Sequence, residues 1–475
     1  MAKIVEQSFK ATLAKSFYNY VKNTDLDDTF YASVIAMDDS EYSLYTGYSL
    51  DSDSEVELFG GLNALEFDEE DKTFYSQSAI SLHKLYVGGV SRVVERTDWK
   101  PNTYYNAWPD SDSHVLVKEY ISGYARLNVY RCLFTPLTPS TYSPSGVSSS
   151  EIYLPDGYVW KYMYTISNSE AQRFLTADYM PVPEKVTRAQ GLSLSTTTNK
   201  YRQYVVQQNA VAGDIYGFNI DSDIIMSQTD IETDSVIYVG ARSSIGTPTT
   251  QAFSAKLNYD SVNKSISAEL IQKGIGYVGQ PIFYNTLTDS DMEGVYGYNT
   301  TNRGHGSDAP AEMFSNRVML VARVIPEEDN LKVIDENEFN MIGLLKNPID
   351  ASTRDISTKD TYVACKSFTT TVESTFVPGE IIKPAPFDDG RRGKVISVKN
   401  SRVYYTSFKI GKESDTFLAA DGVANLTDTK TFTIDTVSDR EYVFNSGDLL
   451  VIDKKHTSFT RSIDSIESLS FLLKF

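Results

Sequence analysis

The chain has 475 residues, a formal net charge of −19 and an ordinary hydrophobic share of 41%. This length allows a large buried core, while the negative charge argues against non-specific binding to nucleic acid or to an anionic membrane, because both require a basic face. Two cysteines, Cys132 and Cys365, are too few for a disulfide framework or a zinc cluster. We therefore expect neither a cofactor, a nucleic acid nor a membrane among its ligands and partners.

The N-terminus has no apolar run of signal-peptide type, and no apolar stretch approaches about 20 residues. We expect a soluble protein made in the cytoplasm. The aromatic residues are mainly Tyr, and Tyr, Thr, Ser, Val and Ile fill most segments, as strands prefer. The composition thus predicts a mainly β fold.

In chain order, apolar residues recur at every fourth position between residues 8 and 23, which predicts a helix. Residues 29–37 predict a strand, and residues 79–85 a short helix. The run "PLTPSTYSPSGVSSS", residues 136–150, is rich in Pro and Ser and predicts an exposed loop.

The stretch "PDGYVWKYMY", residues 155–164, predicts a strand with aromatic residues at alternate positions. Side chains at alternate positions of a strand point to the same face. Such a face is either a platform on which a sugar stacks or the wall of a packed core. Because Val159 and Met163 make the opposite face apolar too, we favour a core. The four rings expected on one face are Tyr158, Trp160, Tyr162 and Tyr164.

Two further stretches have the pattern of separate β-modules, at residues 200–300 and 352–440. In the first, "QYVVQQNAVAGDIYGFNI" alternates apolar and polar residues, so that strands are expected from residue 203 on. In the second, "DDGRRG", residues 388–393, supplies hairpin turn chemistry between two strand runs.

Three short motifs bear on chemistry. "DSDSEVE", residues 51–57, has the oxygen spacing of a calcium loop but lacks its glycine, which favours a solvated acidic loop. "DSDSH", residues 110–114, offers two carboxylates and an imidazole, which suit either a metal with further ligands or an acidic turn. "RGHGSDAP", residues 303–310, places His305 and Asp308 among glycines, as in a catalytic loop or at a sharp turn on a contact surface.

None of these motifs selects a catalytic residue or a metal ligand. Glycosidase chemistry needs only two carboxylates, so it stays open for any sequence this rich in Asp and Glu.

Several segments, in this order, resemble the baseplate wedge protein of T-even-type contractile-tailed bacteriophages, the product of gene eight. These are "VYRCL" at 129–133, the Pro/Ser-rich loop, "DGYVWKYMYTI" at 156–166 and "FLTADYMPVPE" at 174–184. Three more follow: "GHGSD" at 304–308, "NEFNMIGLLKNP" at 337–348 and the closing segment 446–475. The resemblance covers about half of the chain, and the closing segment departs from the family pattern. Interface contacts of that segment are therefore not transferred.

The resemblance implies a structural protein that is not an enzyme, with a layered antiparallel β-sandwich, a few helices and inserted β-modules. It also implies a homodimer that binds other wedge proteins in the virion tail baseplate, after assembly in the host cytoplasm. A carbohydrate-binding receptor-recognition protein or a polysaccharide-degrading tail protein is the alternative. The residues assigned to the core or to an interface are Tyr130, Tyr158, Trp160, Tyr162, Tyr164, Gly304, His305, Asp308 and Phe339.

On this reading the chain divides into five parts. Residues 1–200 begin the sandwich, 201–300 form an inserted module, 301–351 continue the core, 352–440 form a second module, and 441–475 close the core.

Overall fold

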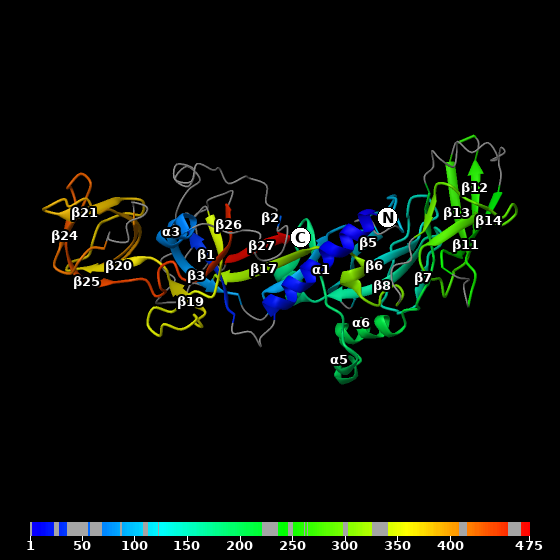
Figure 1. Ribbon diagram of the computed structural model, residues 1–475, viewed down its shortest axis with the longest axis horizontal. Helices are drawn as coiled ribbons and strands as arrows, with labels where there is room; N and C mark the ends of the chain where they lie inside the picture. The colour runs from blue at the N-terminus through cyan, green and yellow to red at the C-terminus, as the bar shows by residue number, and fades with distance from the viewer. Residues whose placement is uncertain are drawn as a thin grey trace. The chain divides into compact units, whose positions relative to one another are not determined.

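The fold is mainly β, as predicted, with several antiparallel sheets and one small closed barrel (Figure 1). The computed structural model describes residues 2–22, 28–35, 56–57, 69–85, 88–107, 113–121, 123–220, 236–245, 250–260, 262–263, 265–297, 303–324, 341–407, 416–454 and 467–475. The predicted N-terminal helix is confirmed as α1 (Ala2–Lys22), although Phe9 of the expected apolar stripe is 63% exposed.

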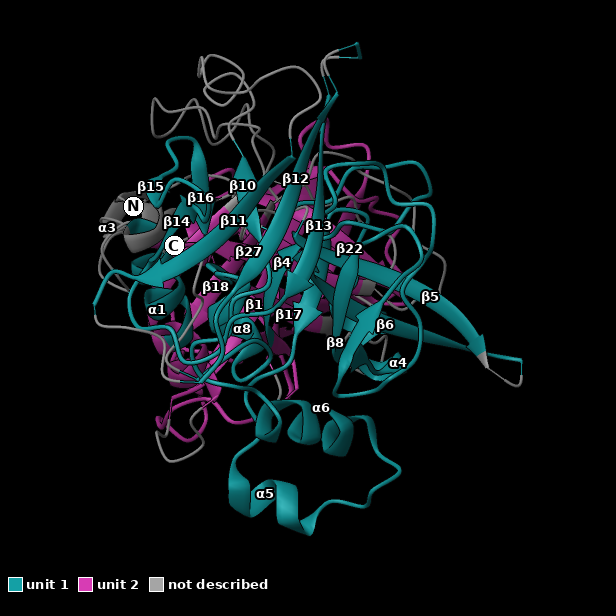
Figure 2. Ribbon diagram, turned by 90° about the vertical axis from the view of Figure 1, so that its right-hand side faces the viewer, with its two compact units in different colours: residues 1–15, 91–317 teal, residues 16–90, 318–475 magenta. Residues whose placement is uncertain are grey.

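The chain forms two compact units (Figure 2). Unit 1 comprises residues 1–15 and 91–317, and unit 2 comprises residues 16–90 and 318–475. The stretch 1–200 contributes to both units.

In unit 1, a four-stranded antiparallel sheet has the order β5 (His114–Ile121), β6 (Tyr124–Phe134), β8 (Val159–Ile166) and β7 (Glu151–Tyr153). The Pro/Ser-rich run predicted as a loop lies between β6 and β7. A second antiparallel pairing joins β4 (Val90–Glu95) to β9 (Tyr179–Val182).

The described residues of unit 1 also form the helices α4 (Asn168–Phe174), α5 (Arg188–Ser193), α6 (Asn199–Gln208) and α8 (Ala309–Glu312). Helix α6 packs against β8, and α5 packs against α6 (Figures 1 and 2). Strands had been expected from residue 203 on, and this is wrong for the part that forms α6. The Thr198 hydroxyl caps the helix by accepting from the Tyr201 N–H. Its buried side chain Val206 packs with the rings of the sheet, whereas Tyr204 lies against Gly191 of α5.

The first predicted β-module contains a five-stranded antiparallel sheet with its own buried core. Its order is β13 (Ser265–Gln272), β12 (Ser254–Asp260), β11 (Val236–Ser243), β14 (Pro281–Asn285) and β15 (Ser290–Asp291). Strands β10 (Phe218–Ile220) and β16 (Val295–Gly297), which precede and follow these strands in the chain, pair with each other in a small antiparallel sheet.

In unit 2, a five-stranded antiparallel sheet has the order β19 (Thr361–Val363), β3 (Ala79–Lys84), β1 (Phe30–Ile35), β18 (Met341–Lys346) and β26 (Asp448–Lys454). The predicted strand at 29–37 is thereby confirmed. The short helix expected at 79–85 is wrong: α3 (Glu69–Ser78) ends just before that stretch, which instead forms the buried strand β3. In the described part of this unit, three strands lie outside both this sheet and the barrel below, namely β2 (Val56–Glu57), β17 (Arg317–Val324) and β27 (Glu467–Lys474).

The second predicted β-module forms a closed six-stranded barrel in unit 2. The "DDGRRG" hairpin is confirmed, because it joins the antiparallel neighbours β21 (Ile381–Ala385) and β22 (Gly393–Lys399). The other barrel strands are β20 (Lys366–Thr370), β23 (Arg402–Ser407), β24 (Gly422–Asn425) and β25 (Thr431–Ser438).

Candidate functional site

The glycine-rich motif of unit 1 forms a tight turn that carries an imidazole into the core. Gly304 and Gly306 have φ of +85° and +87°, a backbone conformation that favours glycine. A Cβ atom on Gly304 would lie 2.0 Å from the carbonyl oxygen of Val211, so no larger residue fits there. Between them, His305 is only 4% exposed.

The turn continues directly into the short helix α8. Asp308 is its N-cap residue and accepts a hydrogen bond from the Ala311 N–H at 3.3 Å, while Pro310 occupies the first turn. This start fixes the helix so that Glu312, its last residue, is buried beside His305.

Glu312 is the centre of a buried hydrogen-bonded network. Its Oε1 accepts from His305 Nδ1 at 2.7 Å, and its Oε2 accepts from the Gly306 N–H at 2.8 Å. The guanidinium of Arg131, which is fully buried on β6, forms an ion pair with the same carboxylate (Nε to Oε1, 3.2 Å). The network therefore ties the turn and helix α8 to the central sheet.

Arg131 belongs to a row of ionisable residues that crosses the whole four-stranded sheet. In the strand register, His114 of β5 pairs with Arg131, Arg131 pairs with Lys161 of β8, and Lys161 pairs with Glu151 of β7. Residues paired in this way share one face of a sheet. Such a face concentrates charge inside the protein, so the charges must compensate one another.

At one end of the row, hydrogen bonding fixes the tautomer of His114. The Arg131 guanidinium can only donate, so Nε2 of His114, at 3.4 Å from Arg131 Nη1, is the acceptor. Nδ1 then carries the proton and donates to the Ser113 hydroxyl at 2.8 Å. Ser113 also accepts from Arg131 Nη1 at 2.7 Å. His114 is therefore a neutral imidazole within the network.

At the other end, Glu151 joins a second cluster. The Lys273 ammonium donates to Glu151 Oε1 at 2.8 Å and to the Tyr216 hydroxyl at 2.9 Å. The Tyr216 hydroxyl also donates to Glu151, and its ring lies edge-on to that of His305 with centroids 5.9 Å apart. Both clusters are thus connected through the Tyr216 side chain.

These contacts shift the pKa values of the buried groups. Burial alone would raise the pKa of Glu312, but His305 and Arg131 lower it to about 2. Burial would also raise the pKa of Glu151, but the hydrogen bonds from Lys273 and Tyr216 lower this pKa to about 2. Burial, together with the positive charge of Arg131, holds the pKa of His114 well below its ordinary value. Burial raises the pKa of Asp214, which accepts from the His305 N–H at 3.3 Å.

The network has little access to solvent. The hollow next to His305 and Tyr216 has a volume of about 10 Å³, which is room for no more than one water molecule. A catalytic His–Glu pair needs a substrate within hydrogen-bond reach, and this hollow admits none of organic size. The arrangement holds the turn, helix α8 and the sheet together, and among the described residues the hollow beside it is too small for an organic substrate.

The opposite face of the same sheet carries the aromatic wall. Tyr158, Trp160 and Tyr162 are all fully buried, and Tyr158 stacks on Trp160 at 5.8 Å between centroids. They pack with Tyr130 of β6 and with Val206 of helix α6. The face is therefore covered by protein and is not open for a sugar to stack on.

The expectation that four rings share one face is wrong for Tyr164. A register shift places Tyr162 opposite Tyr130 but Tyr164 opposite Val129, so that Met163 is an extra residue in β8. Such a β-bulge reverses the alternation of faces beyond it. Tyr164 consequently lies in a separate buried cluster with Met163, and its hydroxyl meets the sulfur of Met313 at 3.8 Å.

The sequence motifs thus identified some site residues and missed others. His305 and Asp308 lie in one turn as expected, whereas Phe339 is outside the described residues, as are Asp110 and Asp112 of the "DSDSH" motif. Arg131, Lys161 and Glu312 were missed. The available signal was a single charge within an otherwise apolar strand, in "VYRCL" and in "VWKYMY".

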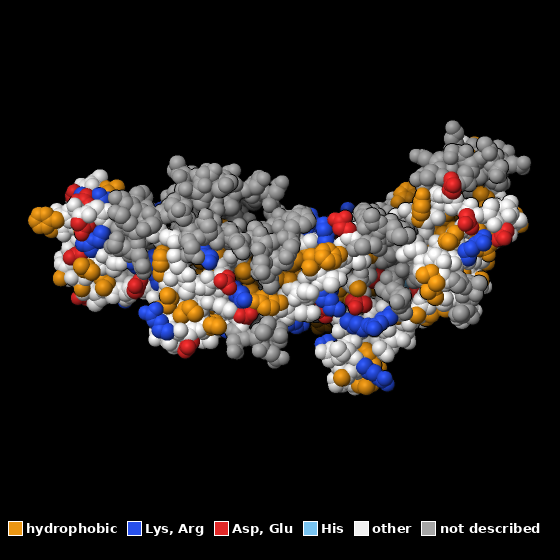
Figure 3. Space-filling view, viewed as in Figure 1, with side chains coloured by type: hydrophobic (Ala, Val, Ile, Leu, Met, Phe, Trp, Pro, Cys, Tyr) orange, Lys and Arg blue, Asp and Glu red, His pale blue; other side chains and the backbone are white. Residues whose placement is uncertain are grey.

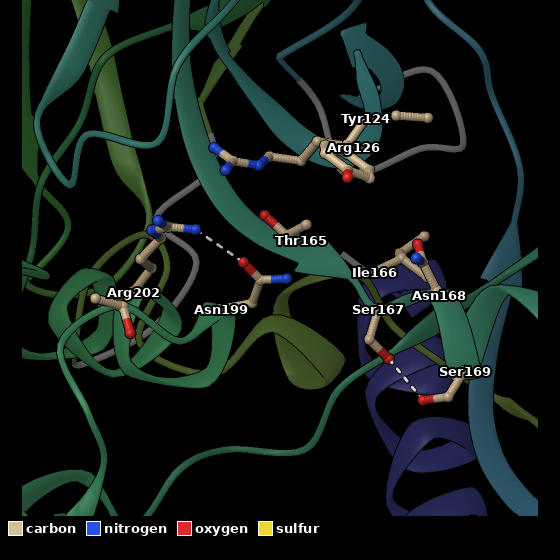
Figure 4. Close-up of a pocket in the computed structure, with 11 residues that line it drawn as sticks. Tyr124, Arg126, Thr165, Ile166, Ser167, Asn168, Ser169, Asn199 and Arg202 are labelled. Carbon is tan, nitrogen blue, oxygen red and sulfur yellow. Dashed lines mark hydrogen bonds between the residues drawn. The ribbon is translucent and has the colours of Figure 1, made fainter. Parts of the chain in front are cut away.

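A second feature of unit 1 is an open cavity of about 510 Å³ (Figure 4). It lies where β6 begins, β8 ends, and helices α4 and α6 start. In Figure 4 the guanidinium groups of Arg126 and Arg202 lie on one side and Ser167, Asn168 and Ser169 on the other. The rest of its lining is Tyr124, Ala125, Thr165, Ile166, Thr197 and Asn199.

Comparison with known proteins identifies no relative: no family model and no curated protein matches this chain. Within the described part of the chain, no helix is long and apolar enough to cross a membrane. The described residues also contain no group of three or more His, Cys, Asp or Glu side chains arranged to hold a metal ion.

Proposed function

We propose that the chain is a structural subunit of a contractile phage tail, a baseplate wedge protein that acts through rigid surfaces and not through catalysis. The observation that carries this proposal is that both faces of the central sheet are filled with protein around Trp160 and Arg131. One face is filled by the rings around Trp160, and the other by the charge network around Arg131 and Glu312. The resemblance of several segments, in the same chain order, to the baseplate wedge family is the reason for naming this particular kind of subunit.

A core that contains a buried charge network suits a subunit that must resist mechanical force. Buried networks of paired charges favour a single arrangement of segments, because other arrangements leave a charge unpaired in the interior. A subunit that must keep its shape while the tail contracts benefits from that property. We further propose that it forms a homodimer and binds other wedge proteins through interfaces of more than about 2,000 Å², as obligate contacts commonly do.

Antibody labelling tests the proposal directly. Antibodies raised against the purified chain should decorate the tail tip of particles from the source of the sequence when these are viewed by electron microscopy. Labelling of tail fibres, or labelling of no particle, would contradict the wedge assignment. Light scattering after size exclusion tests the dimer separately, with a mass of twice 53.1 kDa expected.

The enzyme alternative makes a different prediction. A polysaccharide-degrading tail protein would release reducing ends from host surface polysaccharide, and one Asp or Glu substitution would abolish that release. We expect no release above that of the heat-denatured chain.

A further inference from the structure

The open cavity of unit 1 has the composition of an anion site. Arg126 and Arg202 both project into it, and Arg202 donates to Asn199 Oδ1 at 2.9 Å (Figure 4). Neither guanidinium forms an ion pair with a carboxylate of the described residues. Both guanidinium groups belong to the lining of this one cavity, so two positive charges face the same space.

The carboxylates near the cavity are already engaged. Glu119 lies opposite Arg126 in the strand register, but its carboxylate accepts from the Tyr130 hydroxyl and from the Gly146 N–H at 3.0 Å. Glu170 accepts from the N–H of Ser167 at 2.9 Å, as part of a capping box. Neither carboxylate forms an ion pair with Arg126 or Arg202, so both guanidinium groups can contact an anion, although the negative charge of Glu119 lowers the local positive potential.

The charge of the neighbouring segment also favours an anion in this cavity. Residues 185–213, which include α5 and α6, contain Lys185, Arg188, Lys200 and Arg202 but no Asp or Glu, although the whole chain has a net charge of −19. Figure 3 shows Lys and Arg side chains over these two helices. A local basic surface on an acidic protein attracts and concentrates anions at that place.

The remaining lining indicates what kind of anion fits. More of its surface is polar than apolar, and the polar part comes from the hydroxyl and amide side chains of Thr165, Ser167, Asn168, Ser169 and Thr197. A ligand rich in hydroxyl groups matches such a lining, and Tyr124, 81% exposed at the rim, offers a ring on which a sugar face can stack. The volume of about 510 Å³ lies in the usual range for small-molecule sites.

We propose that this cavity binds an acidic sugar of the uronic-acid class, with the carboxylate held between Arg126 and Arg202 and the hydroxyl groups bonded to the Ser, Thr and Asn side chains. Arginine forks bind carboxylates in two-point fashion, which gives both strength and orientation. This proposal does not rest on the structural function proposed above, and it concerns another surface of unit 1.

Isothermal titration calorimetry with the full chain tests it. Galacturonic acid should bind saturably, whereas galactose, which has the same hydroxyl pattern without the charge, should bind at least about tenfold more weakly. Arg126→Gln and Arg202→Gln should each weaken galacturonic acid binding by about tenfold or more. Arg188→Gln is the matched control, because it removes the same charge from the same basic segment outside the cavity, and it should leave binding unchanged.

Several results would overturn the proposal. They are the absence of galacturonic acid binding to the unmodified chain, equal binding of galactose, or equal weakening by Arg188→Gln. Tighter binding of a tetraglutamate peptide than of the sugar would reassign the cavity to an acidic protein partner. If Arg202→Gln lowers the melting temperature through its lost bond to Asn199, then Arg126→Gln decides, and Arg126→Lys should restore part of the affinity.

Discussion

The imidazole Nδ1 of His305 and the carboxylate Oε1 of Glu312 lie 2.7 Å apart, with both side chains buried. A His–Glu contact of this kind is common in catalytic sites, and the surrounding glycines resemble a catalytic loop. In this protein the carboxylate also holds Arg131 and the Gly306 N–H. It therefore acts as the centre of a structural network that joins α8 to the central sheet.

Replacing Glu312 with Gln should destabilise unit 1 by about 3 to 5 kcal/mol, because Arg131 would then be a buried charge without its partner. Urea unfolding followed by circular dichroism measures the loss. Glu95→Gln is the matched control, since Glu95 is paired with Arg317 at 3.1 Å but is 52% exposed, and it should cost less than about 1 kcal/mol. Equal effects of the two substitutions would contradict the role given to Glu312.

Lowering the pH should destabilise the fold through His114. Burial and Arg131 hold the folded-state pKa well below 6.5, so below pH 6.5 the unfolded chain binds a proton that the folded chain does not. Above pH 6.5 His114 is neutral in both states and does not affect the free energy of unfolding. Below pH 6.5 it lowers that free energy by up to about 1.4 kcal/mol per pH unit. His114→Gln cannot titrate, and its stability should depend less on pH between about pH 7 and 5. Parallel curves for the two proteins would show that His114 has no such effect.

Gly304→Ala should destabilise unit 1 by more than about 1 to 3 kcal/mol, because it adds a clash with the Val211 carbonyl to the cost of a positive φ. Gly146→Ala separates these two effects. Gly146 has a φ of +88° but has no atom within 4 Å of an added Cβ. The difference in thermal stability between the two variants should therefore report the clash alone, and a larger loss for Gly146→Ala would contradict this account.

Much of the fold follows from local patterns in the sequence. The helix at the N-terminus, the strand at 29–37 and the "DDGRRG" hairpin were predictable because spacing and turn chemistry act over a few residues. The face of Tyr164 was not predictable, since the bulge at Met163 arises from pairing with β6. The charge network was equally hidden: His114, Arg131 and Lys161 are far apart in sequence and meet only through the strand register.

Trp160→Ala should cost about 3 to 5 kcal/mol, as expected for a fully buried large ring, because the neighbouring rings cannot close the cavity that it leaves. Tyr104→Ala serves as the control. That ring is 63% exposed and its removal should change the free energy of unfolding by less than about 0.5 kcal/mol. A thermal melt of Trp160→Ala that matches the unmodified chain would show that the aromatic face is not a core.

The central claim is that the aromatic face of the β8 sheet is closed to solvent and to ligands, so that function lies on the outer surfaces. Acrylamide quenching tests it most directly, in a chain whose other two tryptophans, Trp99 and Trp108, are replaced by Phe. We predict a blue-shifted Trp160 emission that acrylamide barely quenches and that neutral saccharides leave unchanged. Quenching as strong as in the urea-unfolded chain, or an emission shift on adding a neutral saccharide, would contradict the account.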